Sequence, residues 1–121
     1  LSGMIQCTSA EKRLHKELSK MANNLNKSAP AALDLYTRFD SVAVTSENVF
    51  QYFYTVTDID NPDALLREKK EDIIDKMKKA FETDRSLQIF VQNNVTMEYI
   101  YRDTSQKVID KIRIDASNPQ K

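Results

Sequence analysis

The sequence predicts an α+β fold in which an antiparallel four-stranded sheet is packed by an N-terminal helix and a central helix. Three observations lead to this prediction: an apolar stripe with helical spacing near the N-terminus, two pairs of alternating segments, and a long charged segment between the pairs. The expected order is helix, two strands, one or two helices, two strands, which is typical of helices layered on an antiparallel sheet. We expect a flexible tail over residues 1–8, one domain over 9–115 and a C-terminal tail over 116–121.

The first predicted helix begins at Ser9, a good N-cap residue, and ends in the region of Pro30. Its polar face mixes acidic and basic side chains, which is typical of a solvated helix surface. The apolar residues recur at steps of four, three and four, on one helix face: Leu14, Leu18, Met21 and Leu25.

The first pair of strands is expected in LDLYTRFDSVAVT and VFQYFYTVTDI, joined through the polar turn TSEN. Alternation in the first strand runs from Leu35 to Phe39 and then changes parity before Val42. We therefore predict a β-bulge near Asp40 or Ser41. In the second strand one face carries Phe50, Tyr52, Tyr54 and Val56, and the only large apolar residue of the other face is Phe53.

The central helix is predicted in DIDNPDALLREKKEDIIDKMKKAFETD. An Asn or Asp cap is followed by Pro62 at an early helical position and by Asp63 in the first turn, where the helix dipole favours an acid. The main apolar stripe consists of Leu66, Ile73, Met77 and Phe81, and Leu65 and Ile74 flank it and widen it. A short apolar cluster, residues 87–91, predicts one or two further helical turns before Asn93 and Asn94.

The C-terminal segments NNVTMEYIYRD and VIDKIRID are separated by a polar DTSQ and read as a second hairpin. Tyr99 and Tyr101 share a parity with Val95 and Met97, and we interpret this face as the inside of the sheet. Tyrosines in that position keep their hydroxyls at the edge of the core.

Charge and hydropathy exclude two classes of partner. The 18 basic residues balance the 18 acidic ones, so no global field favours nucleic acid. No apolar run approaches the roughly 20 residues of a membrane helix, so we expect no membrane span.

The sequence also lacks the patterns of catalytic and metal sites. His15 is the only imidazole and has no Cys or second His at ligand spacing, which argues against zinc and against a hydrolase base. Gly3 is the only glycine, so neither a P-loop nor a dinucleotide fingerprint is present. Asp58, Asp60 and Asp63 are better explained by helix capping than by calcium. We predict a non-enzymatic protein without catalytic residues, cofactor or metal.

The N-terminal residues leave the compartment open. The numbering starts at Leu1 rather than Met, so we expect that an upstream segment has been removed, and a signal peptide is one candidate. The only cysteine, Cys7, has no internal disulfide partner. Met4, Ile5 and Gln6 lack the small residue expected before a lipidated cysteine, so a thiol in the tail is the preferred interpretation.

Three segments together, TRFDSV at 37–42, NVFQYFYT at 48–55 and NNVTMEYIYRD at 93–103, resemble a group of small bacterial exported proteins. Members of that group read roughly TRLDS, NTFxYxYT, a helix and GVxxxYxYxD. Some are similar in arrangement to the pilotins of type II secretion systems, which guide secretin subunits to the outer membrane. The resemblance covers about residues 10–114 and implies no catalytic residue. Group members usually carry one cysteine near the end of the charged helix and one near the C-terminus. The corresponding segments of this chain, KAFETDRS and DASNPQK, contain no cysteine.

The resemblance implies an exported bacterial protein, periplasmic or secreted, that acts as an accessory factor of the envelope or of secretion by binding another protein. Two alternatives stay open. One is a cytosolic interaction or effector-type domain, in which a cysteine pair would have no role. The other is a small-ligand carrier or enzyme with a pocket lined by Tyr52, Tyr54, Tyr99 or Tyr101. The oligomeric state is not predicted.

A partner-binding site is expected either in a groove beside the central helix or at an exposed sheet edge. Three candidate residues are apolar yet lie off the main stripe or inner face of their element: Phe53, Leu65 and Ile100. The competing interpretation is that helices cover both faces of the sheet, which would make Phe53 and Ile100 residues of a second core.

Overall fold

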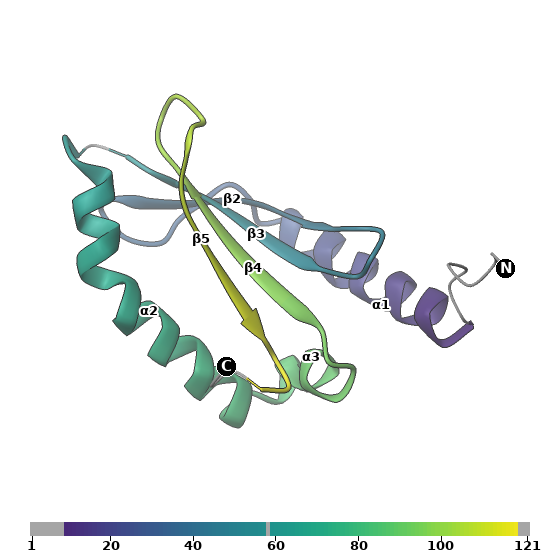
Figure 1. Cartoon of the computed structure of the whole chain (residues 1–121). Helices are drawn as coiled ribbons and strands as arrows, with labels where there is room; N and C mark the ends of the chain where they lie inside the picture. Colours follow the sequence, from purple (N-terminus) through teal and green to yellow (C-terminus); the bar gives the residue numbers. More distant parts are fainter. Residues whose placement is uncertain (1–8, 58, 119–121) are drawn as a thin grey trace, which may run out of the picture.

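The computed structural model describes residues 9–57 and 59–118 as three α-helices and a five-stranded sheet, which is an α+β fold (Figure 1). The elements are α1 (Ser9–Asn26), β1 (Ala31–Ala32), β2 (Thr37–Val44), β3 (Phe50–Val56), α2 (Pro62–Thr83), α3 (Gln88–Gln92), β4 (Thr96–Arg102) and β5 (Val108–Asp115). A short 3-10 turn, Arg85–Leu87, joins α2 to α3.

The predicted tails over residues 1–8 and 119–121 lie outside the described part of the chain, so the domain limits stay a prediction. At the C-terminal limit, Ala116 is buried and its N–H donates to the carbonyl of Val95 at 3.1 Å. The chain therefore still contacts the fold one residue beyond the predicted boundary.

The prediction of a four-stranded antiparallel sheet is wrong in two respects. The strand order is β1-β2-β3-β4-β5, with the two-residue β1 added beside β2. The central pair, β3 and β4, is parallel, whereas the other pairs are antiparallel. The cause is the connection: α2 carries the chain back along the sheet, so the next strand starts at the same end as β3.

Within the outer pairs the predicted register features are confirmed. The β2–β3 register shifts between Phe39 and Ser41, which is the predicted bulge at Asp40. The β4 and β5 strands pair as the predicted antiparallel hairpin. Asn61 caps α2, accepting a hydrogen bond from the N–H of Ala64, and Pro62 opens the helix as expected.

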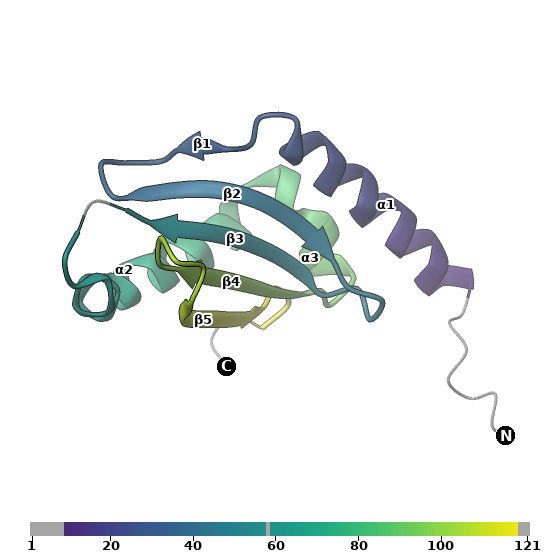
Figure 2. The same cartoon turned by 90° about the horizontal axis from the view of Figure 1, so that it is seen from above.

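The helices cover one face of the sheet, and the strands are open to view on the other (Figure 2). A single core joins Leu18 of α1, Leu66 and Phe81 of α2, and Phe90 of α3 to the inward residues of the sheet. Tyr99 and Tyr101 belong to this core, so their predicted inward orientation is confirmed. The alternative in which helices cover both faces is wrong.

A side-chain amide joins the C-terminal end of α1 to the sheet. Asn26, the last residue of α1, accepts a hydrogen bond from the N–H of Val42 at 2.7 Å and donates one to the carbonyl of Val42 at 2.9 Å. The amide thereby satisfies both backbone groups of a β2 residue, as a neighbouring strand would. These contacts fix the end of the helix against the sheet.

Replacing Asn26 by alanine is expected to lower the free energy of unfolding by roughly 1–3 kcal/mol, because both backbone groups of Val42 lose their partner. Urea denaturation of the variant measures the change. Asn24→Ala, at an exposed position of the same helix, is the matched control and should change stability by less than about 0.5 kcal/mol. Equal effects of the two substitutions would contradict the role assigned to Asn26.

Candidate functional site

A groove of about 450 Å³ lies between α2 and the turn that connects β1 to β2. Val56 and Tyr101 contribute from the sheet, and α2 contributes Leu65, Leu66 and Ile73 among its apolar residues. The volume is within the range of pockets that bind ligands or peptide side chains. This groove is the candidate functional site.

One wall of the groove is the connection over residues 33–36, here called the 33–36 turn. Oδ1 of Asp34 accepts hydrogen bonds from the N–H groups of Tyr36 and Thr37, both at 2.8 Å, which is an Asx turn. The carbonyl of Tyr36 accepts from the N–H of Thr57 at 2.7 Å, tying the turn to the end of β3. These bonds hold the turn in one conformation.

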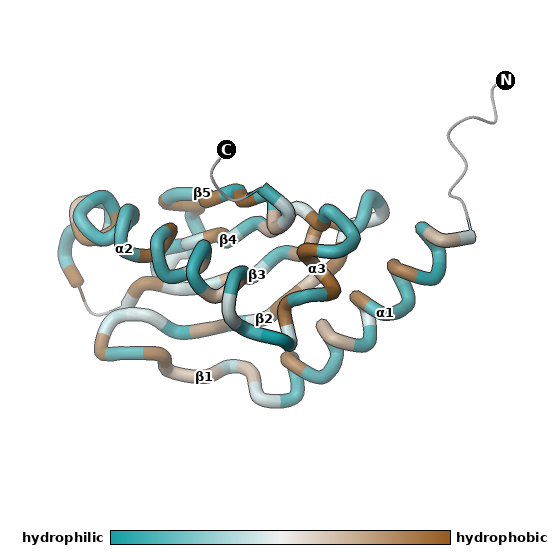
Figure 3. The backbone as a smooth tube through the Cα atoms, turned by 90° about the horizontal axis from the view of Figure 1, so that it is seen from below, coloured by the Kyte–Doolittle hydropathy of each residue, from teal (hydrophilic) through white to brown (hydrophobic). Residues whose placement is uncertain are grey.

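The 33–36 turn exposes apolar side chains. Leu33 is 58%, Leu35 83% and Tyr36 39% exposed. Among the large hydrophobic residues of the described chain, only Val108, at 50%, is similarly exposed. The hydropathy colouring shows this apolar connection between β1 and β2 (Figure 3). Clustering of exposed apolar groups on an ordered turn is typical of an interaction site.

The opposite wall belongs to α2. Leu65, Lys69, Ile73 and Lys76 follow one another at steps of four, four and three, so apolar and basic residues alternate along a single helix face. Asp72 also lines the groove. A segment lying along α2 would therefore meet apolar surface between charged groups.

The structure does not bring the three predicted partner-binding residues together. Leu65 lines the groove, whereas Phe53 and Ile100 pair with one another across β3 and β4 on the helix-free face. Ile100 is 5% exposed although no helix covers it, and Phe53 is half-buried. Whether any of the three contacts a partner stays a prediction.

The alternation of the sequence does not predict the 33–36 turn. Leu35 shares the alternation of Thr37 and Phe39, so it was interpreted as part of a strand. The sequence does contain one signal for this turn, which is Asp34. An aspartate side chain often accepts a hydrogen bond from the backbone N–H two residues later, and this bond forms an Asx turn.

Polar side chains on the helix-free face form a network around Asp40. The carboxylate accepts hydrogen bonds from the Thr55 hydroxyl, from Nε of Arg38 at 2.7 Å and from Nη2 of Arg102 at 3.2 Å. Burial raises the pKa of Asp40, but the hydrogen bonds from Thr55, Arg38 and Arg102 outweigh it, so the pKa lies below its ordinary value. Arg102 also lies over the Phe53 ring, 5.0 Å from its centroid. These groups are engaged with one another, which favours a structural role.

The tyrosines proposed to line a ligand pocket are packed instead as stacked pairs. The Tyr52 and Tyr99 rings lie 5.1 Å apart, and those of Tyr54 and Tyr101 lie 4.8 Å apart. Of the four, only Tyr101 lines the groove. The four side chains therefore do not surround a common pocket.

His15, which was considered as a zinc ligand and as a hydrolase base, lies where α1 meets the β2–β3 turn. His15 Nδ1 lies 2.8 Å from Oδ1 of Asn48, which links α1 to the β2–β3 turn. Over residues 9–57 and 59–118, no group of three His, Cys, Asp or Glu side chains is placed to hold a metal. Within the same ranges no helix has the length and hydropathy to cross a membrane. Cys7 and Asp58 lie outside the described residues.

The fold has counterparts among solved structures. A protein of Pseudomonas aeruginosa described as secreted superposes with a TM-score of 0.78 at 13% identity, over 93% of this chain and 98% of the other. The pilotin EpsS of the Vibrio vulnificus type 2 secretion system gives a TM-score of 0.68 at 14% identity, over 92% and 96%. The type II secretion pilotin AspS of Vibrio cholerae gives 0.63 at 10% identity, over 88% and 93%. At these identities the likeness concerns the fold.

These structures agree with the resemblance of three sequence segments to small bacterial exported proteins and pilotins. A search of curated protein sequences found no match. A family profile matches residues 9–109, which include all three helices and the strands from β1 to β4. The chain belongs to the family described as Domain of unknown function (DUF8479).

Proposed function

We propose that the protein is a non-enzymatic accessory factor of the bacterial envelope or of secretion, and that it acts by binding another protein in the groove between α2 and the 33–36 turn. The observation that carries the proposal is the pairing of this groove with the exposed side chains of Leu33, Leu35 and Tyr36. The likeness in fold to a secreted protein and to two pilotins supports an exported location.

The physical basis is the surface that binding would remove from water. A leucine side chain that is 83% exposed gains free energy when it is buried in an apolar contact. The Asx turn at Asp34 holds Leu35 in place before any partner arrives, so little conformational entropy is lost on binding. A rigid apolar turn beside a groove is therefore well suited to capture a segment of a second protein.

Photo-crosslinking in cells of the native host tests this site. A photoreactive amino acid at Lys69 or Lys76, both exposed at the groove, is expected to give a discrete adduct with another protein, identified by mass spectrometry. Lys111, exposed on β5, is the matched control and should give no such adduct. Adducts of the same protein at Lys111, or none at the two groove positions, would contradict the assignment.

Export is tested separately with the full-length gene product fused to alkaline phosphatase, which becomes active only after leaving the cytoplasm. The fusion is expected to be active, because a partner in the envelope requires an exported protein. An inactive fusion of normal abundance would favour the cytosolic alternative.

A further inference from the structure

We infer that two copies of this chain associate through the groove, each inserting its 33–36 turn into the groove of the other. This inference goes beyond the proposed function, since the occupant is a second copy and not a different protein. It starts from the position of Leu35, which is 83% exposed and lies at the rim of the groove.

The 33–36 turn and the groove both present apolar side chains. The turn presents Leu33 and Leu35, and the groove offers Leu65 and Ile73 of α2 together with the Tyr101 ring. Contact between them would remove from water the apolar groups that a single copy leaves exposed. The exposed apolar side chains and the surface suited to receive them are thus parts of the same molecule.

The charges are also complementary. The turn carries one acidic side chain, Asp34, whose two hydrogen bonds to the turn use Oδ1. The α2 wall carries Lys69 and Lys76, both exposed, together with Asp72, so basic groups outnumber acidic ones on this wall, and Asp34 of the same copy lines the groove from the turn. In the pair, Asp34 of one copy approaches the lysines of the other, which favours association at low ionic strength.

The arrangement closes on itself. Because the turn adjoins the groove, a single two-fold axis beside them brings each turn to the groove of the other copy. Every contact is then made twice, and the assembly ends at two copies. A partner protein in the groove would displace the second copy, so self-association and partner binding would exclude each other.

The first test is sedimentation of the purified protein up to about millimolar concentration. A concentration-dependent dimer is expected, with weaker association at high salt. Leu35→Asp should raise the dissociation constant at least about tenfold for each contact, or roughly a hundredfold for the pair. Val108→Asp, at an apolar residue that is 50% exposed outside the groove, is the matched control and should leave the dimer intact.

A charge variant adds an independent measurement. Asp34→Asn keeps a side-chain oxygen that can accept the hydrogen bonds of the turn and removes only the charge. It should weaken the dimer and abolish most of its salt dependence. Far-UV circular dichroism confirms that each variant is folded.

The geometry is tested by mixing two variants in a Cys7→Ser background. A Leu35→Cys copy and a Lys69→Cys copy should form a disulfide with each other in preference to self-pairing, because the proposed arrangement places Leu35 of one copy against Lys69 of the other. A protein that stays monomeric throughout, a dimer unaffected by Leu35→Asp, or self-pairing as frequent as mixed pairing would overturn the inference. None of these results bears on the adducts with a different protein expected at Lys69 and Lys76.

Discussion

Above pH 10 the protein is expected to lose stability steeply, because four tyrosines are held neutral in its core. Burial raises the pKa of Tyr52 to about 12. Burial, with a smaller effect of Asp34, raises the pKa of Tyr101 to about 12. Burial and the neighbouring tyrosines also raise the pKa values of Tyr54 and Tyr99 above their ordinary value.

The direction follows from proton binding in the two states. In the unfolded chain these tyrosines ionise near pH 10, whereas the folded chain keeps their protons to about pH 12. Their stabilising contribution is therefore complete below pH 10 and is lost as the pH rises toward the folded pKa values. Each proton that the folded state retains and the unfolded state loses lowers the free energy of unfolding by about 1.4 kcal/mol per pH unit. The four tyrosines together therefore lower it by roughly 5.5 kcal/mol per pH unit. The two pH units from 10 to 12 therefore remove about 11 kcal/mol. Since a domain is stable by about 5–15 kcal/mol, a stability in the lower two thirds of this range predicts cooperative unfolding between about pH 11 and 12.

Absorbance at 295 nm reports tyrosinate, and far-UV circular dichroism reports folding. In a Tyr36→Phe background, which leaves only the four core tyrosines, the two signals should change together, because the buried hydroxyls ionise only when the core opens. Tyr99→Phe removes one of the four ionising groups, so the slope of unfolding free energy against pH should fall by about a quarter. If the tyrosinate signal of these four residues developed near pH 10 while the dichroism stayed native, burial would not be holding them neutral.

The parts of the fold that were predicted correctly are those encoded by local pattern. The helical spacing of Leu14, Leu18, Met21 and Leu25 predicted α1, and Leu18 is buried with no exposed surface. The change of parity between Phe39 and Val42 predicted the bulge. In each case a few neighbouring residues specify the geometry, so no information from distant parts of the chain was needed.

The features that were missed depend on contacts distant in sequence. Nothing local distinguishes a parallel from an antiparallel partner for β3, because Phe50 meets Met97 only after α2 has returned the chain. The two residues of β1 are too few to show alternation. The groove was expected beside the central helix, and Leu65 does line it, but its second wall comes from a turn 30 residues earlier that was interpreted as a strand.

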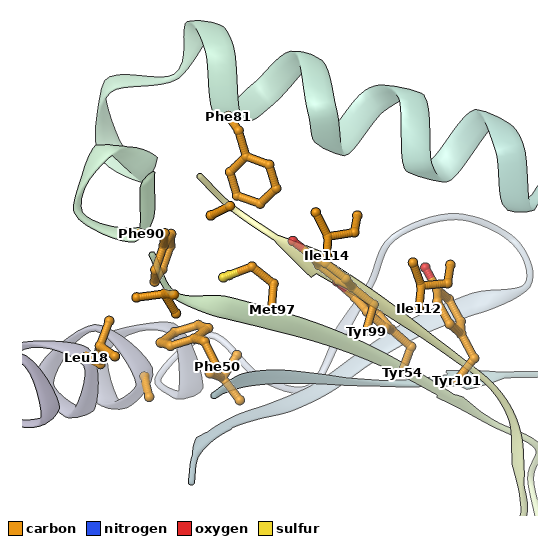
Figure 4. Close-up of a cluster of buried hydrophobic side chains, with 14 of the residues drawn as sticks. Leu18, Phe50, Tyr54, Phe81, Phe90, Met97, Tyr99, Tyr101, Ile112 and Ile114 are labelled. Carbon is orange, nitrogen blue, oxygen red and sulfur yellow. The ribbon is translucent and has the colours of Figure 1, made fainter. Parts of the chain in front are cut away.

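The second large effect is expected for Phe50→Ala. The Phe50 ring has no exposed surface and lies 4.9 Å from the Phe90 ring, which is also fully buried. Figure 4 shows both rings beside Leu18 of α1, where two helices meet the sheet. Removing the ring leaves a cavity at this junction, so we expect a loss of about 3–5 kcal/mol in the free energy of unfolding, measured by urea denaturation.

Phe53→Ala is the matched control, because it removes the same ring from the same strand on the opposite face. Phe53 is half-buried and covered by Arg102 instead of a helix, so its loss should cost about 1–2 kcal/mol.

Adding Phe90→Ala to Phe50→Ala should cost less than the sum of the single changes, since the second substitution removes a contact that is already lost. Equal costs for Phe50→Ala and Phe53→Ala would mean that both faces of β3 are equally buried, which would contradict a sheet covered by helices on one side. We expect a larger loss of unfolding free energy for Phe50→Ala, on the helix-covered face, than for Phe53→Ala, on the other face. With non-additive losses for Phe50 and Phe90, this result would show that the core between the sheet and the helices supplies most of the stability.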